Sequence, residues 1–109
     1  MKILKRDYAK ERRAKKRAKK DADRKWYAVN LSKRPECEVC GKPAIQIHHF
    51  YPKGLYGHLR LHEMNGISLC MYHHFRHHHL GDPVIHQTII TRRGKKWYNY
   101  LTKLAYERK

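Results

Sequence analysis

The chain contains two short metal-binding motifs, Cys37-Glu-Val-Cys40 and Cys70-Met-Tyr-His73. Each sets two metal-ligating side chains three positions apart, which is the spacing of a zinc knuckle. A closed structural zinc site takes four thiolate or imidazole ligands in tetrahedral geometry. We therefore expect these four residues to hold a structural zinc ion that joins the two ends of the segment between them.

The composition indicates one small domain that meets a polyanion. The chain has 109 residues and a formal net charge of +17. A chain of this length has a thin core, for which a metal ion is a plausible staple. The charge favours nucleic acid as the partner, although a basic tail that only keeps the protein soluble would give the same balance.

The cysteine content and the hydropathy indicate where the protein works. Three cysteines are an odd number and do not predict a disulfide framework, so the thiols are expected to be free for metal. The chain shows no signal peptide and no apolar run of about 18 residues. We expect no membrane association and a cytoplasmic location, in the host cytoplasm if the protein is phage-encoded.

A basic segment, residues 1–34, precedes the metal-binding part. Half of the 26 Lys and Arg residues lie within residues 1–25. Residues 10–25 contain neither Gly nor Pro and too few apolar side chains for a core-facing stripe, which predicts a solvated helix or a disordered arm. Its expected role is to contact phosphates, with Lys15, Lys16 and Arg17 as representative contacts. Trp26 marks the point where the chain begins to have something to bury.

Residues 36–80 have the pattern of a metal-clamped ββα unit. Residues 44–48 have an alternating side-chain pattern that includes β-branched isoleucines, which predicts a strand, and residues 66–70 predict a second one. The Pro- and Gly-containing residues 50–64 predict a long loop between them. Residues 71–80 contain no helix breaker and predict a helix that ends at Gly81. The expected fold is therefore a small α+β domain stapled by zinc.

Residues 82–109 are expected to form helices that cover this unit. Asp82-Pro83 is a helix start, with Asp as the N-cap and Pro at the first helical position. Gly94 interrupts the apolar periodicity, which resumes from Lys95. Arg92 and Arg93 would enlarge the basic surface.

A double histidine, His48-His49, stands where the first strand enters the loop. Adjacent strand residues point to opposite faces, so one imidazole could face a metal ion while the other faces a substrate. His74 and His78 lie four apart on the following helix and can point to the same ion as His48. The alternatives are that the histidine-rich helix is a surface metal trap, or an accident of a basic helix that faces DNA.

The run His48-His49-Phe-Tyr-Pro52, followed by Asn65-Gly-Ile-Ser-Leu-Cys70-Met-Tyr-His73-His74, resembles the HNH endonuclease motif, also called the His-Me finger or ββα-metal fold. The resemblance covers about residues 36–80, which would make residues 35–109 an HNH nuclease domain. Residues 81–109 and the Leu59-Arg60 run are most similar to small phage recombination nucleases of the NinG/Rap type. The implied activity is metal-dependent hydrolysis of DNA phosphodiester bonds, with branched recombination intermediates as a candidate substrate.

The resemblance also implies a role for each motif residue. His49 would be the general base for the attacking water, and Asn65 would hold the loop that orients it. His48 and His74, with His78 as a candidate third ligand, would bind the catalytic divalent ion. The expected products carry a 5′-phosphate and a 3′-hydroxyl.

Two positions depart from the common pattern. His73 stands where Cys is usual, and a site closed by His74 instead is the alternative. His48 stands where many members have Asp. A histidine there favours Ni²⁺ or Zn²⁺ as the catalytic ion, while Mg²⁺ and Mn²⁺ stay possible.

The competing interpretation of the whole chain is a non-catalytic zinc module that binds DNA or RNA. Resolving a junction would require a dimer, for which the sequence gives no clear face. Further candidate nucleic-acid contacts are Lys53, Arg60, Arg92 and Arg93.

Overall fold

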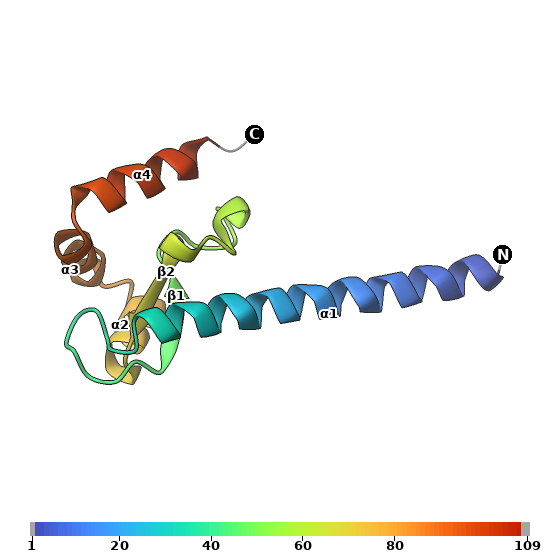
Figure 1. Ribbon diagram of the computed structural model, residues 1–109, viewed down its shortest axis with the longest axis horizontal. Helices are drawn as coiled ribbons and strands as arrows, with labels where there is room; N and C mark the ends of the chain where they lie inside the picture. Colours follow the sequence, from blue (N-terminus) through green and yellow to red (C-terminus); the bar gives the residue numbers. More distant parts are fainter. Residues whose placement is uncertain (1, 108–109) are drawn as a thin grey trace.

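The structure, a computed structural model, describes residues 2–107 of the chain, and the side chains of residues 8–107. Within this range it has a small α+β architecture with four α-helices and one two-stranded sheet, as the sequence predicts (Figure 1). The elements in chain order are α1 (Lys2–Lys33), β1 (Gln46–His49), η1 (Gly57–Leu59), η2 (Glu63–Asn65), β2 (Gly66–Leu69), α2 (Met71–Leu80), α3 (Pro83–Arg93) and α4 (Lys95–Tyr106).

The sheet is an antiparallel pair of short strands. His48 lies opposite Ile67 and His49 lies opposite Gly66. The first strand begins two residues later than predicted, because the backbone N–H of Ala44 donates to the carbonyl of Pro35 rather than to β2. It also extends one residue further and ends on His49, so both histidines of the pair belong to the strand.

The helix boundaries after the sheet follow the expected signals. α2 ends at Gly81, whose φ of +58° suits a residue without a Cβ atom. The Asp82 carboxylate accepts a hydrogen bond from the backbone N–H of Val84 and caps α3. Gly94, with φ of +96°, separates α3 from α4.

The core lies where the sheet, α3 and α4 meet. Its apolar side chains come from β2 and from one side of each covering helix, in agreement with the predicted covering role. The members with at most 2% exposure are Cys37, Phe50, Leu59, Ile67, Leu69, Ile85, Ile89, Leu101 and Ala105. Phe50 and Trp97 pack edge to face, with ring centroids 5.0 Å apart, and join the loop after β1 to α4.

The C-terminal part of α1 packs on the sheet, whereas its N-terminal half extends away from the other elements (Figure 1). Trp26 and Asn30 are buried, and the Trp26 Nε1–H donates to the carbonyl of His62 at 2.9 Å. Asn30 occupies the space above Gly66, where an added Cβ would lie 2.4 Å from the Asn30 Oδ1. Residues 26–33, expected to belong to a basic arm, are therefore part of the packed structure.

A helix that crosses a bilayer needs about 20 consecutive, mainly apolar residues. Within residues 2–107, no helical stretch has both the length and the apolar character that crossing a bilayer needs. The longest helix, α1, is also the most highly charged element.

Candidate metal centres and catalytic histidine

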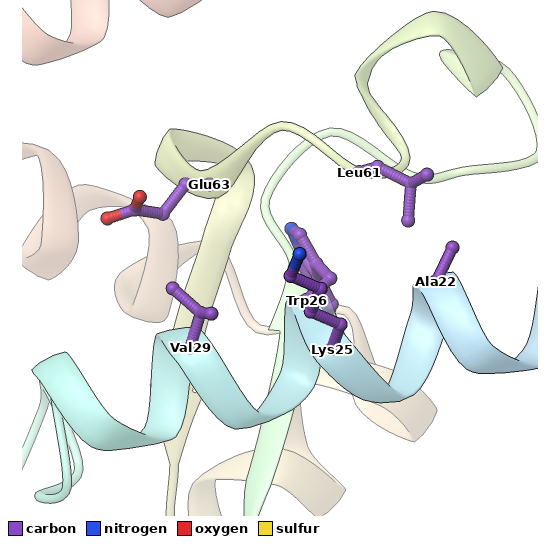
Figure 2. Close-up of a pocket in the computed structure, with 6 residues that line it drawn as sticks. All are labelled: Ala22, Lys25, Trp26, Val29, Leu61 and Glu63. Atoms are coloured by element: carbon purple, nitrogen blue, oxygen red, sulfur yellow. The ribbon is translucent and has the colours of Figure 1, made fainter.

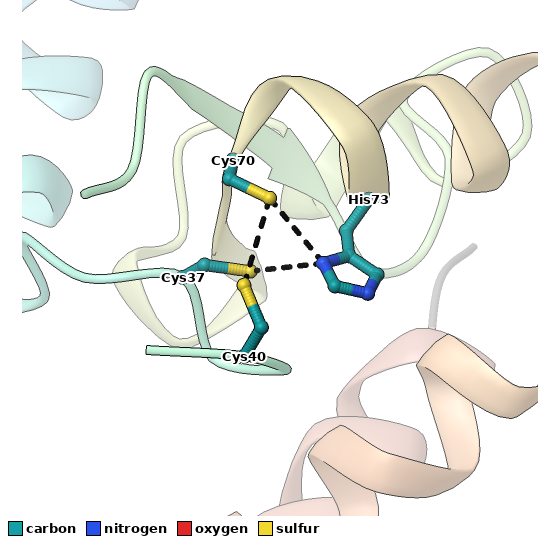
Figure 3. A group of neighbouring side chains, drawn as sticks. All are labelled: Cys37, Cys40, Cys70 and His73. Atoms are coloured by element: carbon teal, nitrogen blue, oxygen red, sulfur yellow. Dashed lines mark hydrogen bonds between the residues drawn. The ribbon is translucent and has the colours of Figure 1, made fainter. Parts of the chain in front are cut away.

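Three thiols and one imidazole converge between the turn before β1 and the start of α2 (Figure 3). The Cys37 Sγ lies 3.6 Å from the His73 Nδ1, and the Cys70 Sγ lies 3.3 Å from the same nitrogen. The Cys40 and Cys70 sulfur atoms are 3.7 Å apart. Cys37 and Cys70 are buried, while Cys40 is exposed.

The spacing of these atoms fits a tetrahedral ion. With Zn–S near 2.3 Å and Zn–N near 2.0–2.1 Å, ideal tetrahedral geometry separates two sulfurs by about 3.8 Å and a sulfur from a nitrogen by about 3.6 Å. The observed separations lie close to these values. The cluster of Cys37, Cys40, Cys70 and His73 could therefore hold a metal ion such as zinc.

Local backbone geometry prepares the thiols for this role. The first knuckle is closed by a hydrogen bond from the Cys37 N–H to the Lys42 carbonyl at 2.6 Å, and Gly41 turns the chain with φ of +80°. Burial alone would raise the pKa of the Cys70 thiol. Hydrogen bonds from the backbone N–H and the side chain of His73, and from the neighbouring thiols, outweigh burial and lower that pKa to about 6. A thiolate, the form that binds metal, is thus favoured near neutral pH.

A second group of candidate ligands lies at a neighbouring side of α2. One nitrogen from each of His48, His74 and His78 lies within 4.8 Å of the others. The His48 Nε2 is 3.2 Å from the His78 Nδ1, and the rings of His74 and His78 are nearly parallel, 5.6 Å apart. His73 thus joins the thiols while His74 joins the histidine group, which assigns the two adjacent histidines to different clusters.

The tautomer of His48 is set by its neighbour. Its Nδ1–H donates to the carbonyl of His49 at 3.3 Å, which leaves the Nε2 lone pair directed at the histidine group. Burial, together with the proximity of His74 and His78, lowers the pKa of His48 to about 4 against the opposing effect of the backbone hydrogen bond. The ring is therefore neutral at pH 7, as a metal ligand must be.

The other histidines of α2 take different positions. His77 packs edge-on against His48 with ring centroids 4.5 Å apart. His77 also contacts His86 of α3, at a centroid distance of 4.9 Å. His79 is exposed. Within the described residues, neither His77 nor His79 belongs to a group of three candidate ligands.

His49 is held by its Nε2 and by one face of its ring. The Nε2–H donates to the carbonyl of Arg60 at 2.9 Å, so the Nδ1 carries the lone pair of the neutral ring. The Trp26 indole stacks on the imidazole, with centroids 4.3 Å apart and planes 6° apart. Burial lowers the pKa of His49, and Lys53 and Arg60 lower it further, while the hydrogen bond to the Arg60 carbonyl and the Asp23 carboxylate oppose the shift.

Asn65 ties both ends of the loop that carries His49 and Arg60. Its fully buried amide accepts from the Tyr51 N–H at 2.8 Å and donates to the carbonyls of Tyr51 at 3.1 Å and Leu59 at 3.3 Å. These partners are close neighbours in sequence of His49 and of its acceptor, Arg60. The amide thus restrains the loop geometry from which the His49 hydrogen bond is made.

The predicted nucleic-acid contacts fall into two groups. Lys53, Arg92 and the three α1 residues Lys15, Lys16 and Arg17 are exposed. Arg60 pairs with Asp23 of α1 and keeps 23% of its side chain exposed. Arg93 is different: its guanidinium makes a two-pronged ion pair with Glu38 at 2.6 and 2.7 Å, and its side chain is only 10% exposed.

Arg93 is therefore corrected from a surface cation to an internal one. It also donates to the Gly66 carbonyl at 2.7 Å, and the Glu38 carboxylate accepts from the Ser68 N–H at 2.8 Å. The pair joins the first knuckle, β2 and α3, and all its strong donors are directed inward. Sequence alone did not distinguish Arg93 from its exposed neighbour Arg92.

Three residues around the candidate sites were not predicted. Trp26, Asp23 and Glu38 contact the histidine at the strand end, its acceptor residue and the buried arginine, respectively. The available signal for Trp26 was an aromatic side chain at the end of a charged run, and for Glu38 its position inside the CxxC turn.

Comparison of this chain with protein-family models, curated proteins and solved structures finds no match.

Proposed function

We propose that the protein is a metal-dependent endonuclease that hydrolyses DNA phosphodiester bonds with His49 as the general base. The observation that carries the proposal is the division of labour between two consecutive imidazoles. His49 has its Nε2 bonded to a carbonyl and its Nδ1 lone pair available, while His48 presents its Nε2 to His74 and His78. The similarity of residues 36–80 to the HNH motif supports the same roles.

The chemistry follows from those lone pairs. The His49 Nδ1 takes a proton from water as the water oxygen forms a bond to phosphorus, and the bond from phosphorus to the 3′ oxygen breaks. The products are a 5′-phosphate and a 3′-hydroxyl once the leaving oxygen is protonated. A divalent ion bound by His48, His74 and His78 would supply charge neutralisation at the phosphoryl group and the leaving oxygen.

The surrounding residues suit this task. The hydrogen bond to Arg60 and the stacked Trp26 leave the His49 ring little freedom to rotate. Burial lowers the pKa of His49, so its imidazole stays neutral, and able to accept a proton, at pH values where a free imidazole would already be protonated. We place the activity in the cytoplasm, with plain duplexes and branched junctions as candidate substrates.

The test is cleavage of supercoiled plasmid and of a synthetic four-way junction in Mg²⁺, Mn²⁺, Ni²⁺ or Zn²⁺. His49→Ala should lower the cleavage rate by about 10²–10⁴-fold, the usual contribution of a general base. His58→Ala is the matched control, because the His58 Nε2–H also donates to a backbone carbonyl, that of Leu104 at 2.9 Å. Equal rates for His49→Ala and wild type would refute the assignment of the base. The absence of nicking by the wild type in every metal would favour a non-catalytic zinc module that binds DNA or RNA.

A further inference from the structure

One side of α1 continues from the packed part of the molecule into its exposed half. On the packed part this side carries three residues that contact the rest of the molecule. Asp23 pairs with Arg60, Trp26 stacks on His49, and Asn30 lies over Gly66. These residues are three and four positions apart, so they occupy one line along the helix. Continuing the same steps towards the N-terminus reaches three exposed cations, Lys19, Lys16 and Arg12.

The residue types along this side of α1 therefore differ between its two halves, which are positions 12, 16 and 19 and positions 23, 26 and 30. Its C-terminal half contacts the catalytic histidine and the sheet, and its N-terminal half is purely cationic. The other side of the exposed half also carries cations, among them Lys10, Arg17 and Arg24, but these point away from the core. The net charge alone does not separate the two sides, whereas the packing of Trp26 does.

We propose that Arg12, Lys16 and Lys19 bind the phosphates of a DNA duplex that extends to one side of the bond presented to His49. The inference rests on the proposed endonuclease function for the position of the cleaved bond. Trp26 links the two parts, because it belongs to the same side of α1 and touches the ring of His49. A strand that reaches His49 would thus run past these cations on the core-facing side of the helix.

The length of the helix sets the span of the contact. An α-helix rises 1.5 Å per residue, so the backbone of Arg12 lies about 21 Å along the helix axis from that of Trp26. B-form DNA advances 3.4 Å per base pair, so this distance corresponds to about six base pairs. The expected footprint is one-sided, because the N-terminal half of α1, which carries the three cations, extends from the rest of the molecule in a single direction (Figure 1).

A duplex is favoured over a single strand as the occupant. Proteins that bind single strands combine cations with aromatic side chains on which successive bases stack. Residues 9–25 of α1 contain no aromatic residue, and Tyr8, one step beyond Arg12 on the same side, lies with its ring centroid 5.9 Å from the Arg12 guanidinium. A row of cations with a single aromatic residue at its end offers no surface on which successive bases stack. It instead suits the regular phosphates of a duplex, which are contacted without regard to sequence.

The experiment compares two triple variants that remove the same charge from opposite sides of one helix. The first is Arg12→Gln/Lys16→Gln/Lys19→Gln, and the control is Lys10→Gln/Arg17→Gln/Arg24→Gln. Glutamine preserves the helix propensity of Lys and Arg, so circular dichroism should match for all three proteins. The affinity for a 20-base-pair duplex is measured without added divalent ion, over a range of salt concentrations, to avoid cleavage.

The slope of log K against log salt is negative, and the first variant should reduce its magnitude by about 2.7, since each phosphate contact contributes about 0.9. The control should lower it by less than about 1. Equal slopes for the two variants, or a larger loss in the control, would overturn the proposal. Tighter binding of a single strand than of the duplex by the wild type would also overturn it.

A cleavage experiment tests the placement separately. End-labelled duplexes are shortened one base pair at a time on either side of the cut, and the rate should fall on one side only, below about six base pairs. The first triple variant should lose this dependence. If the wild type cleaves nothing while the two slopes still differ, the endonuclease function fails and the cationic side stands. If cleavage occurs with a symmetric length requirement, the cationic side fails and the endonuclease stands.

Discussion

The indole of Trp26 lies parallel to the imidazole of His49, with ring centroids 4.3 Å apart and planes within 6°. Trp26 belongs to α1, and His49 is the last residue of β1. The indole is itself fixed, because its N–H donates to the His62 carbonyl at 2.9 Å. The contact joins a helix that otherwise has the composition of a solvated arm to the ring proposed to activate water. Figure 2 shows Trp26 among Ala22, Lys25, Val29, Leu61 and Glu63, which line a surface pocket beside it.

We expect Trp26 to act as a positioning residue for His49. Trp26→Ala should lower kcat for plasmid cleavage by about tenfold or more with little change in KM, because the ring of His49 gains freedom to rotate away from the productive geometry. Trp26→Phe keeps an aromatic face and should restore most of the rate, although the hydrogen bond to His62 is lost. A change confined to KM, or no difference between Ala and Phe, would show that Trp26 does not position His49.

The two adjacent histidines of α2 should differ in their effect on tightly bound zinc. His73→Ala should remove the fourth ligand of the thiol cluster, so that zinc measured by mass spectrometry after dialysis falls below one ion per chain and the thermal transition broadens. His74→Ala should leave that zinc in place, because its ring lies with His48 and His78. Full retention of zinc by His73→Ala, with loss in His74→Ala, would reverse the assignment of the two histidines.

Gly66 should be intolerant of a methyl group. A Cβ there would lie 2.4 Å from the Asn30 Oδ1 of α1, and Asn30 is fully buried. Gly66→Ala should therefore lower the free energy of unfolding by about 1–3 kcal/mol, the usual cost of overpacking. Gly57→Ala is the control, since an added Cβ meets nothing within 4 Å there. Chemical denaturation measures both, and a second substitution, Asn30→Ala, should relieve the clash and reduce the difference between Gly and Ala at position 66.

Arg92 and Arg93 should give opposite results despite being neighbours. Arg93→Gln leaves the Glu38 carboxylate without its partner in a largely buried setting, which should lower the free energy of unfolding by about 3 kcal/mol. Arg92→Gln, at an exposed position, should change it by less than about 0.5 kcal/mol. Thermal unfolding monitored by circular dichroism distinguishes them. Similar unfolding energies for the two variants would contradict the structural role of Arg93.

The local elements were predictable because their causes lie within a few residues of one another. The cap at Asp82 with Pro83, the turns at Gly81 and Gly94, and the alternation before His48 each depend on short-range backbone geometry. The start of β1 was less predictable, because it depends on whether the Ala44 N–H bonds to Pro35 or to β2. That choice is made by contacts with another part of the chain.

The ligand types and spacings of the two knuckles, the order of strand, strand and helix, and the excess of positive charge follow from the amino-acid sequence. Three relationships depend on the packing of the folded chain: His73 joins the thiols while His74 joins His48, Arg93 turns inward while Arg92 stays exposed, and Trp26 covers His49. The physical reason is that spacing along one chain specifies which sides of a helix or strand residues occupy. Which partner each side meets depends on how distant segments pack, and on the desolvation and pairing of charges that this packing brings about.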